Sequence, residues 1–384
     1  MRCCEACFDD QYLKDYIRQH GRLGTCQYCR SRHRFVTDAG DLQHLFTRFT
    51  DIYAPVNAGV NVPNDADVFD YGQSLAELIQ EQWDVFSDKL IRRDKQSDLL
   101  DDIFTAGLHN EEILDAPDVN DLWTDHDWLH TSLLEQWYEL SDELKHPEQH
   151  EDVAPGLEPT EDDIAAAMDP LGWFEDDVER AATTLPTGTA IFRARFRYRE
   201  VDDRYDALAI DQMGAPPPDR VTSPGRANDV GVSYFYGAED ERTAVAEVRP
   251  HTGALVSVAS GTIVRDIRVL NLPKGMYLST PFEIQDGYLR SLLESCDLFN
   301  RLNREFSRPL RHTDDIIDYR PTQYFATWAR EHRYDGIRYT SAMTKDGINL
   351  VLFDPAVVRL VDVLLVRVEK VEVTFAAYAG EEDD

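Results

Sequence analysis

The feature that most constrains the fold of the first part of this chain is a set of four regularly spaced cysteines. Two Cys-x-x-Cys pairs lie 18 residues apart and are formed by Cys4, Cys7, Cys26 and Cys29. Each pair can close a tight turn that offers two sulfurs to one ion, and four thiolates complete the tetrahedral shell that zinc prefers. Because four protein ligands leave no open coordination position, we predict a structural zinc ion rather than a catalytic one.

Other interpretations of these cysteines stay open at this point. The pairs could be redox-active, and Cys3, His20 or His33 could replace one of the four ligands. Five of the six cysteines fall within the first 29 residues, which is not the spread of a disulfide framework. We therefore expect a zinc ribbon over residues 1–40 and a reducing, cytoplasmic environment.

The overall charge limits the partners of the chain. It has 72 acidic against 39 basic residues and a formal net charge of −33, so we expect no general attraction to nucleic acid or to an anionic membrane. A local basic cluster in the ribbon could contact nucleic acid, but given this net charge we interpret it as a solvated rim; it comprises Arg30, Arg32, His33 and Arg34. No signal peptide is recognised, and no stretch approaches the ~20 apolar residues that span a bilayer.

Residues 41–140 predict a mainly helical domain. Apolar side chains recur at spacings of three and four, as an amphipathic helix requires, at Leu75, Leu78, Ile79, Trp83, Phe86 and Leu90. Ser74 is the expected N-cap of this helix, and Glu77 completes a capping box. Residues 141–162 are acidic and contain proline and glycine, which predicts an exposed linker, and 380–384 predict a solvated acidic tail.

Residues 163–379 predict an α+β domain. Runs rich in β-branched and aromatic residues predict strands over Ile191–Phe196, Val232–Tyr236, Leu255–Val258, Thr262–Leu270, Gly336–Tyr339, Leu350–Phe353 and Val357–Val366. Helices are expected over Trp173–Thr183, Ala238–Pro250, Tyr288–Glu294 and Pro321–Glu331. No Gly-x-Gly-x-x-Gly motif follows a strand and no phosphate-loop motif is present, which argues against a Rossmann or P-loop fold.

A few polar side chains in this domain indicate a site for an anionic ligand. Arg193 lies in an apolar run and Arg226 in a Gly-Arg-Ala-Asn turn, and a guanidinium group can bind phosphate through two parallel hydrogen bonds. Glu247 lies among small and apolar residues, where a carboxylate is costly unless it is paired. Together with Tyr236 and Ser341, these side chains fit a small anionic ligand whose sugar is attacked.

These segments resemble the RES-domain family, which is named for its arginine, glutamate and serine. The resemblance extends from about Thr187 to Asp362, and the positions that match the family pattern are Arg193, Arg226, Asn228, Tyr236, Glu247 and Ser341. The sequence departs from the pattern at Ala227, where the family usually has an aromatic residue. The long spacing between the first arginine and the glutamate leaves Arg195 as an alternative to Arg193.

The resemblance implies an ADP-ribosyltransferase-like fold, in which two packed β-sheets form a cleft that bends NAD. It implies catalytic roles for Glu247, Arg193, Tyr236 and Ser341, and NAD binding by Arg193, Arg226, Asn228, Tyr236 and Ser341. Family members are NAD-consuming enzymes, and many are toxins held by an antitoxin partner. The helical region resembles the HEPN-type extension found on some RES proteins, but no histidine follows an arginine by five positions, so the nuclease pair of that class is missing.

Three functions remain open from the sequence. The first hypothesis is cleavage of the nicotinamide–ribose bond of NAD by hydrolysis or phosphorolysis, in a toxin–antitoxin or defence system. The second is ADP-ribosylation of a protein acceptor. The third is a non-enzymatic interaction protein that uses its zinc and helical regions to bind a partner.

Overall fold

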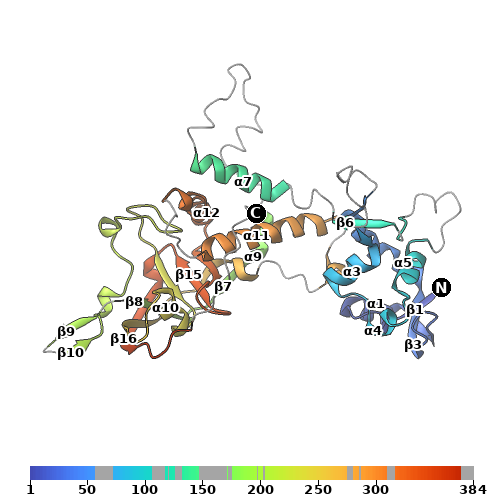
Figure 1. Cartoon of the computed structure of the whole chain (residues 1–384), viewed down its shortest axis with the longest axis horizontal. Coiled ribbons are helices and arrows are strands. Elements are labelled where there is room, and N and C mark those ends of the chain that lie inside the picture. Colours follow the sequence, from blue (N-terminus) through green and yellow to red (C-terminus); the bar gives the residue numbers. More distant parts are fainter. Residues whose placement is uncertain are drawn as a thin grey trace, which may run out of the picture. The chain divides into compact units, whose positions relative to one another are not determined.

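The computed structural model divides into two compact units (Figure 1). The N-terminal unit comprises Met1–Gln136 and Met276–Asp297, and the C-terminal unit comprises Trp137–Gly275 and Leu298–Asp384. The structure describes residues 1–56, 72–105, 117–119, 121–125, 132–146, 171, 175–196, 198–201, 204–274, 280–284, 287–308 and 316–372. None of the helices among these residues is long and apolar enough to cross a membrane.

The N-terminal unit begins with a three-stranded antiparallel sheet and one helix. The strands are β1 (Arg2–Cys4), β2 (Arg22–Thr25) and β3 (Arg32–Asp38), in the order β1-β3-β2. Helix α1 (Gln11–His20) follows β1, and Asp10 caps it by accepting a hydrogen bond from the Leu13 amide at 2.9 Å. A buried Asx cap of this kind satisfies one of the amides that a helix start leaves unpaired.

The region after the ribbon contains both short helices and a second small sheet. The helices are α2 (Gln43–Phe46), α3 (Leu75–Trp83), α4 (Asp88–Ile91) and α5 (Gln96–Thr105). Strands β4 (Tyr53–Pro55), β6 (Leu122–Asp125) and β5 (Gln73–Ser74) form an antiparallel sheet in that order. The prediction of a mainly helical region therefore missed three strands, which are only two to four residues long.

The predicted helix with Ser74 as its N-cap is confirmed at its start and corrected at its end. Ser74 and Glu77 form the expected capping box. The helix α3 ends at Trp83, because Asp84 adopts a left-handed conformation with φ of 50° and its amide donates to the Gln80 carbonyl. Phe86 therefore lies in the connection to α4, and the apolar spacing continued across a break in the helix.

One hydrophobic core joins the ribbon, the helices and a distant segment of the chain. It contains all four motif cysteines together with the rings of Phe8, Phe46, Phe49, Phe86 and Phe282. Phe282 belongs to the segment Met276–Asp297, which clusters with the N-terminal unit. Buried Arg48 holds this segment by donating from Nη1 to the carbonyls of Pro281 and Ile284 at 2.6 and 2.8 Å. This segment lies within 163–379, the range predicted for the C-terminal domain.

The C-terminal unit is built on an eight-stranded mixed sheet (Figure 1). The strand order is β16-β12-β8-β11-β15-β14-β13-β7, and only β13 and β14 run parallel to each other. In chain order the strands are β7 (Ala182–Leu185), β8 (Ala190–Arg195), β11 (Phe235–Ala238), β12 (Leu255–Ile263), β13 (Ile267–Asn271), β14 (Gly336–Thr340), β15 (Ile348–Leu352) and β16 (Val358–Arg367). A separate hairpin pairs β9 (Arg199–Val201) with β10 (Arg204–Asp206). The domain is therefore α+β, as predicted.

The helices of this unit are α7 (Ser132–Lys145), which begins within the N-terminal unit, α9 (Glu175–Ala181), α10 (Glu241–Glu247), α11 (Leu289–Ser307) and α12 (Arg320–Glu331). Helix α7 extends into the range predicted as a linker, and most of that range, like the tail 380–384, lies outside the described residues. Helix α11 contributes its residues up to Asp297 to the N-terminal unit. It is much longer than the helix predicted over Tyr288–Glu294.

Strand boundaries differ from prediction between residues 255 and 271. The sequence predicted a break after Val258, but β12 continues to Ile263 and β13 starts at Ile267. The reason is that Ser260 and Gly261 form an irregularity in the pairing with β16 rather than a turn. A Cβ atom on Gly261 would lie 2.5 Å from the Arg359 carbonyl oxygen, so glycine is required for this close approach of two strands.

Candidate functional site

A small cleft in the C-terminal unit has a floor formed by four residues that are paired across neighbouring strands of the sheet. Phe192 pairs with Ala238, Ala238 with Asn349, and Asn349 with Tyr339. Residues directly opposite each other on neighbouring strands project from the same face. These four side chains, from β8, β11, β15 and β14, therefore form a continuous surface, and all four line the cleft.

The sheet is nearly split at this point. Strands β8 and β11 share a single residue pair, Ala238 with Phe192, whereas β11 and β15 pair over four residues. The two strands diverge beyond that pair, and both contribute to the cleft. Gly237 allows their closest approach, because a Cβ atom there would lie 2.8 Å from the Phe192 carbonyl oxygen.

Arg193 lies where the two strands diverge, and it lines the cleft. Its Nη1 donates to the Tyr236 carbonyl at 3.1 Å, and its guanidinium lies 5.1 Å from the centre of the Phe235 ring. Burial, together with the neighbouring charge of Arg195, lowers the pKa of Arg193 to about 10. No carboxylate forms an ion pair with Arg193 in the described part of the chain, so its charge is available to an anionic ligand.

Arg195, the alternative to Arg193 in the sequence pattern, has a different environment. Its Nη2 donates to the carbonyl of Gly214 at 2.9 Å. It is not among the residues that line the cleft. The structure therefore places Arg193, and not Arg195, at the site.

Glu247 is the last residue of the short helix α10, which packs on β8, β11, β12 and β15. Asp240 caps the start of the helix by accepting from the Thr243 amide at 2.8 Å. The apolar neighbours of Glu247 in the sequence suggested a buried carboxylate, and this expectation requires correction. Thr243 and Ala244 are buried, but Glu247 is exposed at the helix end and lines the cleft.

Two buried side chains fix the carboxylate of Glu247 through the same oxygen. The Ser341 hydroxyl donates to Oε1 at 2.6 Å, and Asn349 Nδ2 donates to Oε1 at 2.7 Å. Among the described residues, no side chain donates to Oε2 and no arginine or lysine pairs with Glu247. The anchored carboxylate thus keeps one oxygen free to act on a ligand in the cleft.

The turn between β14 and β15 carries Ser341 and packs against helix α10, which carries Glu247. Ser341 begins the turn, and its amide donates to the Gly347 carbonyl at 2.8 Å. Thr344 in the same turn lies 3.0 Å from Thr243 of α10 through their hydroxyl oxygens. A Cβ atom on Gly347 would collide with both threonine side chains, so glycine is needed for the close packing of turn and helix.

Tyr236 connects the cleft to the Gly-Arg-Ala-Asn turn. It lines the cleft, and its hydroxyl donates to Asn228 Oδ1 at 2.6 Å and accepts from the Ala227 amide at 3.2 Å. Burial raises the pKa of the Tyr236 hydroxyl. This tyrosine is therefore a neutral hydrogen-bonded wall of the cleft at physiological pH.

Arg226 and Asn228 do not line the cleft. Arg226 Nη1 donates to the Glu305 carbonyl of α11 at 2.9 Å, and its guanidinium lies 5.4 Å from the centre of the Tyr319 ring. Buried Asn228 donates to the carbonyls of Asp229 and Val232 and accepts from Tyr236. Of the six residues predicted for the NAD site, the structure brings together Arg193, Tyr236, Glu247 and Ser341. The other two, Arg226 and Asn228, lie outside the cleft.

Asn349 and Tyr339 were missed by sequence reasoning. Asn349 is a buried polar residue within the apolar run Ile348–Leu352, which is the same signal that drew attention to Glu247. Tyr339 carried no such signal, because an aromatic residue is ordinary in a strand. Its position beside Asn349 depends on the pairing of β14 with β15.

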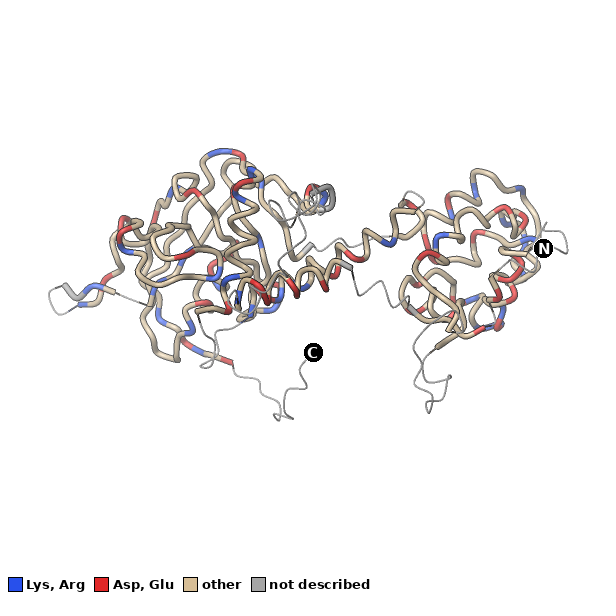
Figure 2. The backbone as a smooth tube through the Cα atoms, turned by 90° about the horizontal axis from the view of Figure 1, so that it is seen from above, with Lys and Arg blue, Asp and Glu red and all other residues tan. Residues whose placement is uncertain are grey.

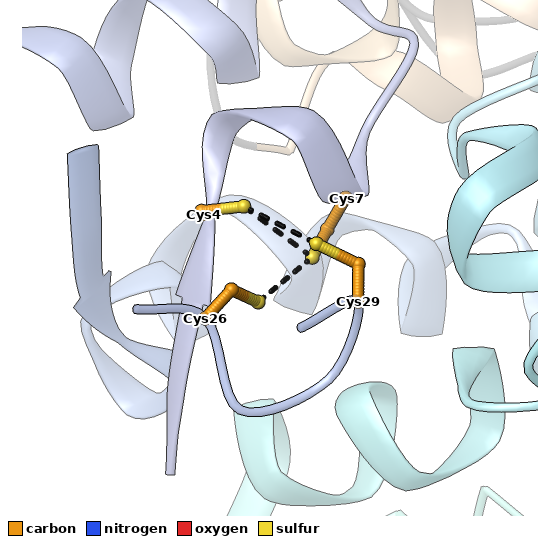
Figure 3. A group of neighbouring side chains, drawn as sticks. All are labelled: Cys4, Cys7, Cys26 and Cys29. Atoms are coloured by element: carbon orange, nitrogen blue, oxygen red, sulfur yellow. Dashed lines mark hydrogen bonds between the residues drawn. The ribbon is translucent and has the colours of Figure 1, made fainter. Parts of the chain in front are cut away.

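A second candidate site is the cysteine cluster of the N-terminal unit (Figure 3). The sulfurs of Cys4, Cys7, Cys26 and Cys29 all lie within 4.8 Å of one another, and all four residues are buried. The shortest sulfur–sulfur separations are 3.4 and 3.5 Å, close to the ~3.8 Å expected between tetrahedral ligands about 2.3 Å from one zinc ion. The hydrogen bonds with Cys26 and Cys29 raise the pKa of the Cys7 thiol.

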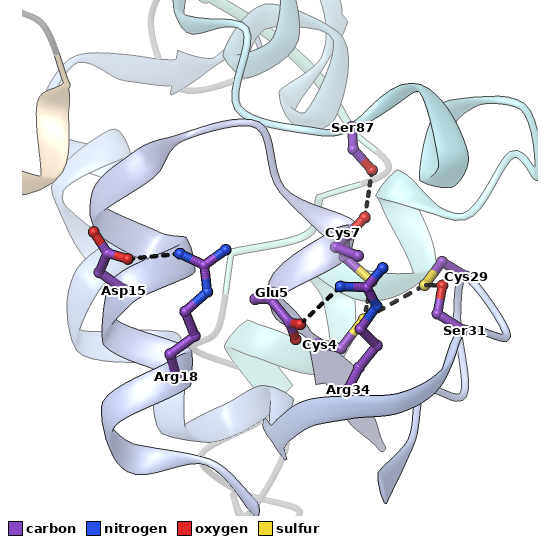
Figure 4. A network of polar contacts seen from close by, with 10 residues as sticks. Cys4, Glu5, Cys7, Asp15, Arg18, Cys29, Ser31, Arg34 and Ser87 are labelled. Atoms are coloured by element: carbon purple, nitrogen blue, oxygen red, sulfur yellow. Dashed lines mark hydrogen bonds and ion pairs between the residues drawn. The ribbon is translucent and has the colours of Figure 1, made fainter. Parts of the chain in front are cut away.

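The other ligands considered from the sequence lie outside this cluster. Cys3 donates towards the Thr37 carbonyl at 3.9 Å, and His20 and His33 are exposed. The donor set is therefore four thiolates, which fits a closed structural zinc site in a zinc ribbon. The Cys7 carbonyl accepts from the Ser87 amide at 2.9 Å, and the Ala6 carbonyl accepts from the Ser87 hydroxyl at 2.7 Å (Figure 4). The first cysteine turn is thus tied to the helical region.

Comparison with known proteins identifies the C-terminal half of the chain. Among solved structures, the M. tuberculosis MbcT–MbcA toxin–antitoxin complex is similar at 14% sequence identity and a TM-score of 0.28, over 50% of this chain and 91% of that chain. A likeness at this level does not define the fold. No curated protein matches the chain. Residues 191–376, which include Arg193, Glu247 and Ser341, match the RES domain, so this part of the chain is identified as a RES domain.

Proposed function

We propose that the RES domain binds NAD in the cleft and cleaves the bond between nicotinamide and ribose. The single observation that carries this proposal is the state of Glu247. Its Oε1 is anchored by Ser341 and Asn349, and no side chain of the described residues donates to its Oε2. The same cleft contains Arg193, which forms no ion pair with a described carboxylate. A fixed carboxylate beside a fixed cation suits a dinucleotide whose sugar develops positive charge.

The chemistry requires little from the protein beyond positioning and charge. In NAD the nicotinamide nitrogen is already cationic, so the ring leaves as a neutral molecule and needs no general acid. The ribose becomes oxocarbenium-like, and a carboxylate held close to it stabilises that charge. Water then adds to the ribose carbon and loses a proton, which gives ADP-ribose, nicotinamide and H⁺; inorganic phosphate in place of water gives the corresponding sugar phosphate.

The dimensions and charges of the cleft support binding of one end of the dinucleotide. Its volume of about 200 Å³ is below the ~300–1,000 Å³ typical of pockets that enclose a whole ligand. We assign the nicotinamide and its ribose to the cleft, beside Glu247 and against Tyr236 and Tyr339. The pyrophosphate would then lie at the opening where Arg193 can bind it.

The split in the sheet supports an ADP-ribosyltransferase-like fold as part of this proposal. Three strands, β16, β12 and β8, lie on one side of the single pair between Phe192 and Ala238, and five strands lie on the other. A sheet divided in this way can bend into two layers around a ligand. The eight strands remain one hydrogen-bonded sheet here, whereas the family resemblance implies two packed sheets.

The match to the RES domain supports a further part of the proposal, namely that the protein is the toxin of a toxin–antitoxin or defence system. An enzyme that depletes NAD must be restrained, and a partner protein that inserts a segment into the cleft would block Glu247 and Arg193 together. Zinc on the four cysteines would stabilise the N-terminal unit and take no part in the reaction. The HEPN-type character of the helical region remains a prediction.

The test is product analysis of NAD incubated with the zinc-loaded full-length protein, with and without phosphate. Nicotinamide release is expected, and Glu247→Gln should slow it by at least about a hundredfold, as removal of one electrostatic stabiliser does in other enzymes. Glutamine retains an acceptor oxygen for Ser341 and Asn349, so the site should stay folded. Glu241→Gln, which removes the same charge from the exposed first residue of α10, is the matched control.

The products distinguish the possible reactions. Free ADP-ribose supports hydrolysis, a phosphorylated ADP-ribose supports phosphorolysis, and label transferred from NAD to a protein supports ADP-ribosylation. Unchanged nicotinamide release by Glu247→Gln would refute the mechanism. Absence of NAD binding by calorimetry would refute the assignment of the substrate and leave the non-enzymatic interpretation.

A further inference from the structure

The strongest feature that the proposed function does not use is a segment of the ribbon with an unusual charge. From Tyr16 to Thr37 the chain contains five arginines and two histidines and no acidic residue, although acidic residues outnumber basic ones 72 to 39 in the whole chain. Acidic residues occur in both units (Figure 2), and residues 96–144 contain no lysine or arginine. A basic segment of this kind in such an acidic protein indicates a surface that binds an anion.

The five arginines of this segment fall into two groups. Arg18 pairs with Asp15 at 2.8 Å and Arg34 with Glu5 at 3.4 Å (Figure 4). Arg22, Arg30 and Arg32 are exposed and form no ion pair with the residues that the structure describes. These three guanidinium groups therefore face solvent without an ion-paired carboxylate from the described part of the chain.

An exposed apolar pair lies among these cations. Leu23 and Phe35 are directly opposite each other on β2 and β3, so they project from the same face of the ribbon sheet. Leu23 is 72% exposed and Phe35 is 37% exposed. Arg32 opposes Thr25 two residues further along β2, whereas Arg22 and Arg34 are strand neighbours of the pair and project from the opposite face of the sheet. All of the exposed cations and the apolar pair belong to the hairpin of β2 and β3, and β2 is an edge strand of the sheet. We call the exposed surface of this hairpin the basic ribbon face; it comprises Arg22, Leu23, Arg30, Arg32 and Phe35.

From this geometry we propose that the basic ribbon face binds single-stranded nucleic acid. Guanidinium groups bind phosphates through paired hydrogen bonds, and an exposed aromatic ring beside a cationic surface is a platform on which an unpaired base can stack. An acidic polypeptide would use the cations but would leave Phe35 and Leu23 without matching planar groups. The combination of cations and an exposed apolar pair on one hairpin therefore favours a single strand.

The net charge of −33 does not exclude this interaction. Charges more than about 8 Å away are largely screened at physiological ionic strength, so a strand in contact with the ribbon responds mainly to the nearest side chains. The overall charge instead reduces long-range attraction, and we expect affinity in the micromolar range rather than tight binding. Neutralisation of three phosphates predicts a slope of about −2 for log K against log salt concentration, at ~0.7 per contact.

The experiment measures fluorescence anisotropy of a labelled 20-nucleotide dT strand with the zinc-loaded full-length protein at 50 mM salt. We expect saturable binding that weakens at least tenfold in the triple variant R22Q/R30Q/R32Q. The triple variant K89Q/R92Q/R93Q removes the same charge from exposed positions around α4 in the same unit, and it should bind as the unchanged protein does. Circular dichroism and zinc content verify that both variants are folded.

Two further measurements distinguish binding of nucleic acid from binding of other anions. Phe35→Ala should weaken binding of the dT strand by about fivefold or more, the lower end of what loss of one stacking platform causes, and should not change binding of a labelled polyglutamate peptide. No binding of the dT strand at 50 mM salt, or equal losses in the two triple variants, would overturn the proposal. Tighter binding of polyglutamate than of the dT strand, with no effect of Phe35→Ala, would assign the face to an acidic protein instead.

Discussion

The two donors to Glu247 allow a sharp test of how the cleft works. Ser341 and Asn349 both hold Oε1, at 2.6 and 2.7 Å, and both are buried. A hydrogen bond to a charged group contributes about 1.5–3 kcal/mol. Because Glu247 is exposed and water can replace part of what is lost, we use the lower end of this range. Removal of one donor, in Ser341→Ala or Asn349→Leu, should then lower kcat for nicotinamide release by about tenfold.

The double variant should lose more than the product of the two single losses. While one donor remains, the carboxylate is still tethered through Oε1, whereas loss of both lets it rotate away from the ribose. A reacting group misplaced by about 1 Å can cost a hundredfold in rate, so we expect a total loss of a few hundredfold. KM for NAD should change by less than about threefold, because Arg193 and Tyr236 are untouched.

The assay is the initial rate of nicotinamide release at a series of NAD concentrations, measured by chromatography. The control is the Glu247→Gln protein with the same two substitutions added. If Ser341 and Asn349 act only by positioning the Glu247 carboxylate, their removal should not slow a protein that already lacks this carboxylate. If Ser341→Ala and Asn349→Leu together leave kcat within threefold of the unchanged protein, the proposal that these two residues position the Glu247 carboxylate is refuted. The proposal is also refuted if the two substitutions slow the Glu247→Gln protein by the same factor as they slow the unchanged protein.

Three other predictions follow from the two arginines and the cysteines. Burial next to Arg195 lowers the pKa of Arg193 to about 10, which means that its positive charge lowers the stability of the folded protein at pH 7. Arg193→Met should therefore raise KM for NAD at least tenfold, while the melting temperature stays equal or rises. Arg226→Met should do the opposite: loss of its bond to the Glu305 carbonyl should lower stability by about 1–2 kcal/mol in thermal denaturation and leave KM within threefold. Cys7→Ser should abolish the single equivalent of zinc expected by metal analysis and strongly lower the melting temperature of the N-terminal unit, whereas Cys296→Ser should retain the zinc.

Local signals in the sequence were sufficient for several elements. The capping box of Ser74 and Glu77 depends on two residues three positions apart, and the strand prediction over Gly336–Tyr339 depends on a short run of β-formers; both are confirmed. The grouping of the four cysteines also follows from spacing alone, because each pair forms its own turn. Properties of this kind are encoded within a few neighbouring residues.

Features that depend on packing could not be predicted in this way. The apolar spacing between Leu75 and Leu90 continues through a left-handed residue at Asp84, since buried side chains on both sides of a break can share one core. The segment Met276–Asp297 clusters with the N-terminal unit through contacts such as that between Arg48 and the Pro281 carbonyl, more than 200 residues apart. No local pattern carries information over that distance.

The same distinction separates the residues of the cleft. Arg193 and Arg226 are equivalent in the sequence, since each is an arginine with small or apolar neighbours that matches the family pattern. They differ only in what the fold places beside them. Strands β8 and β11 separate after one residue pair, which leaves space at Arg193, whereas α11 brings the Glu305 carbonyl within 2.9 Å of Arg226. The first guanidinium therefore lines the cleft, whereas the second lies outside it and is bound to the carbonyl of a helix. The register that aligns Phe192, Ala238, Asn349 and Tyr339 thus decides which of two equally plausible cations becomes part of the site.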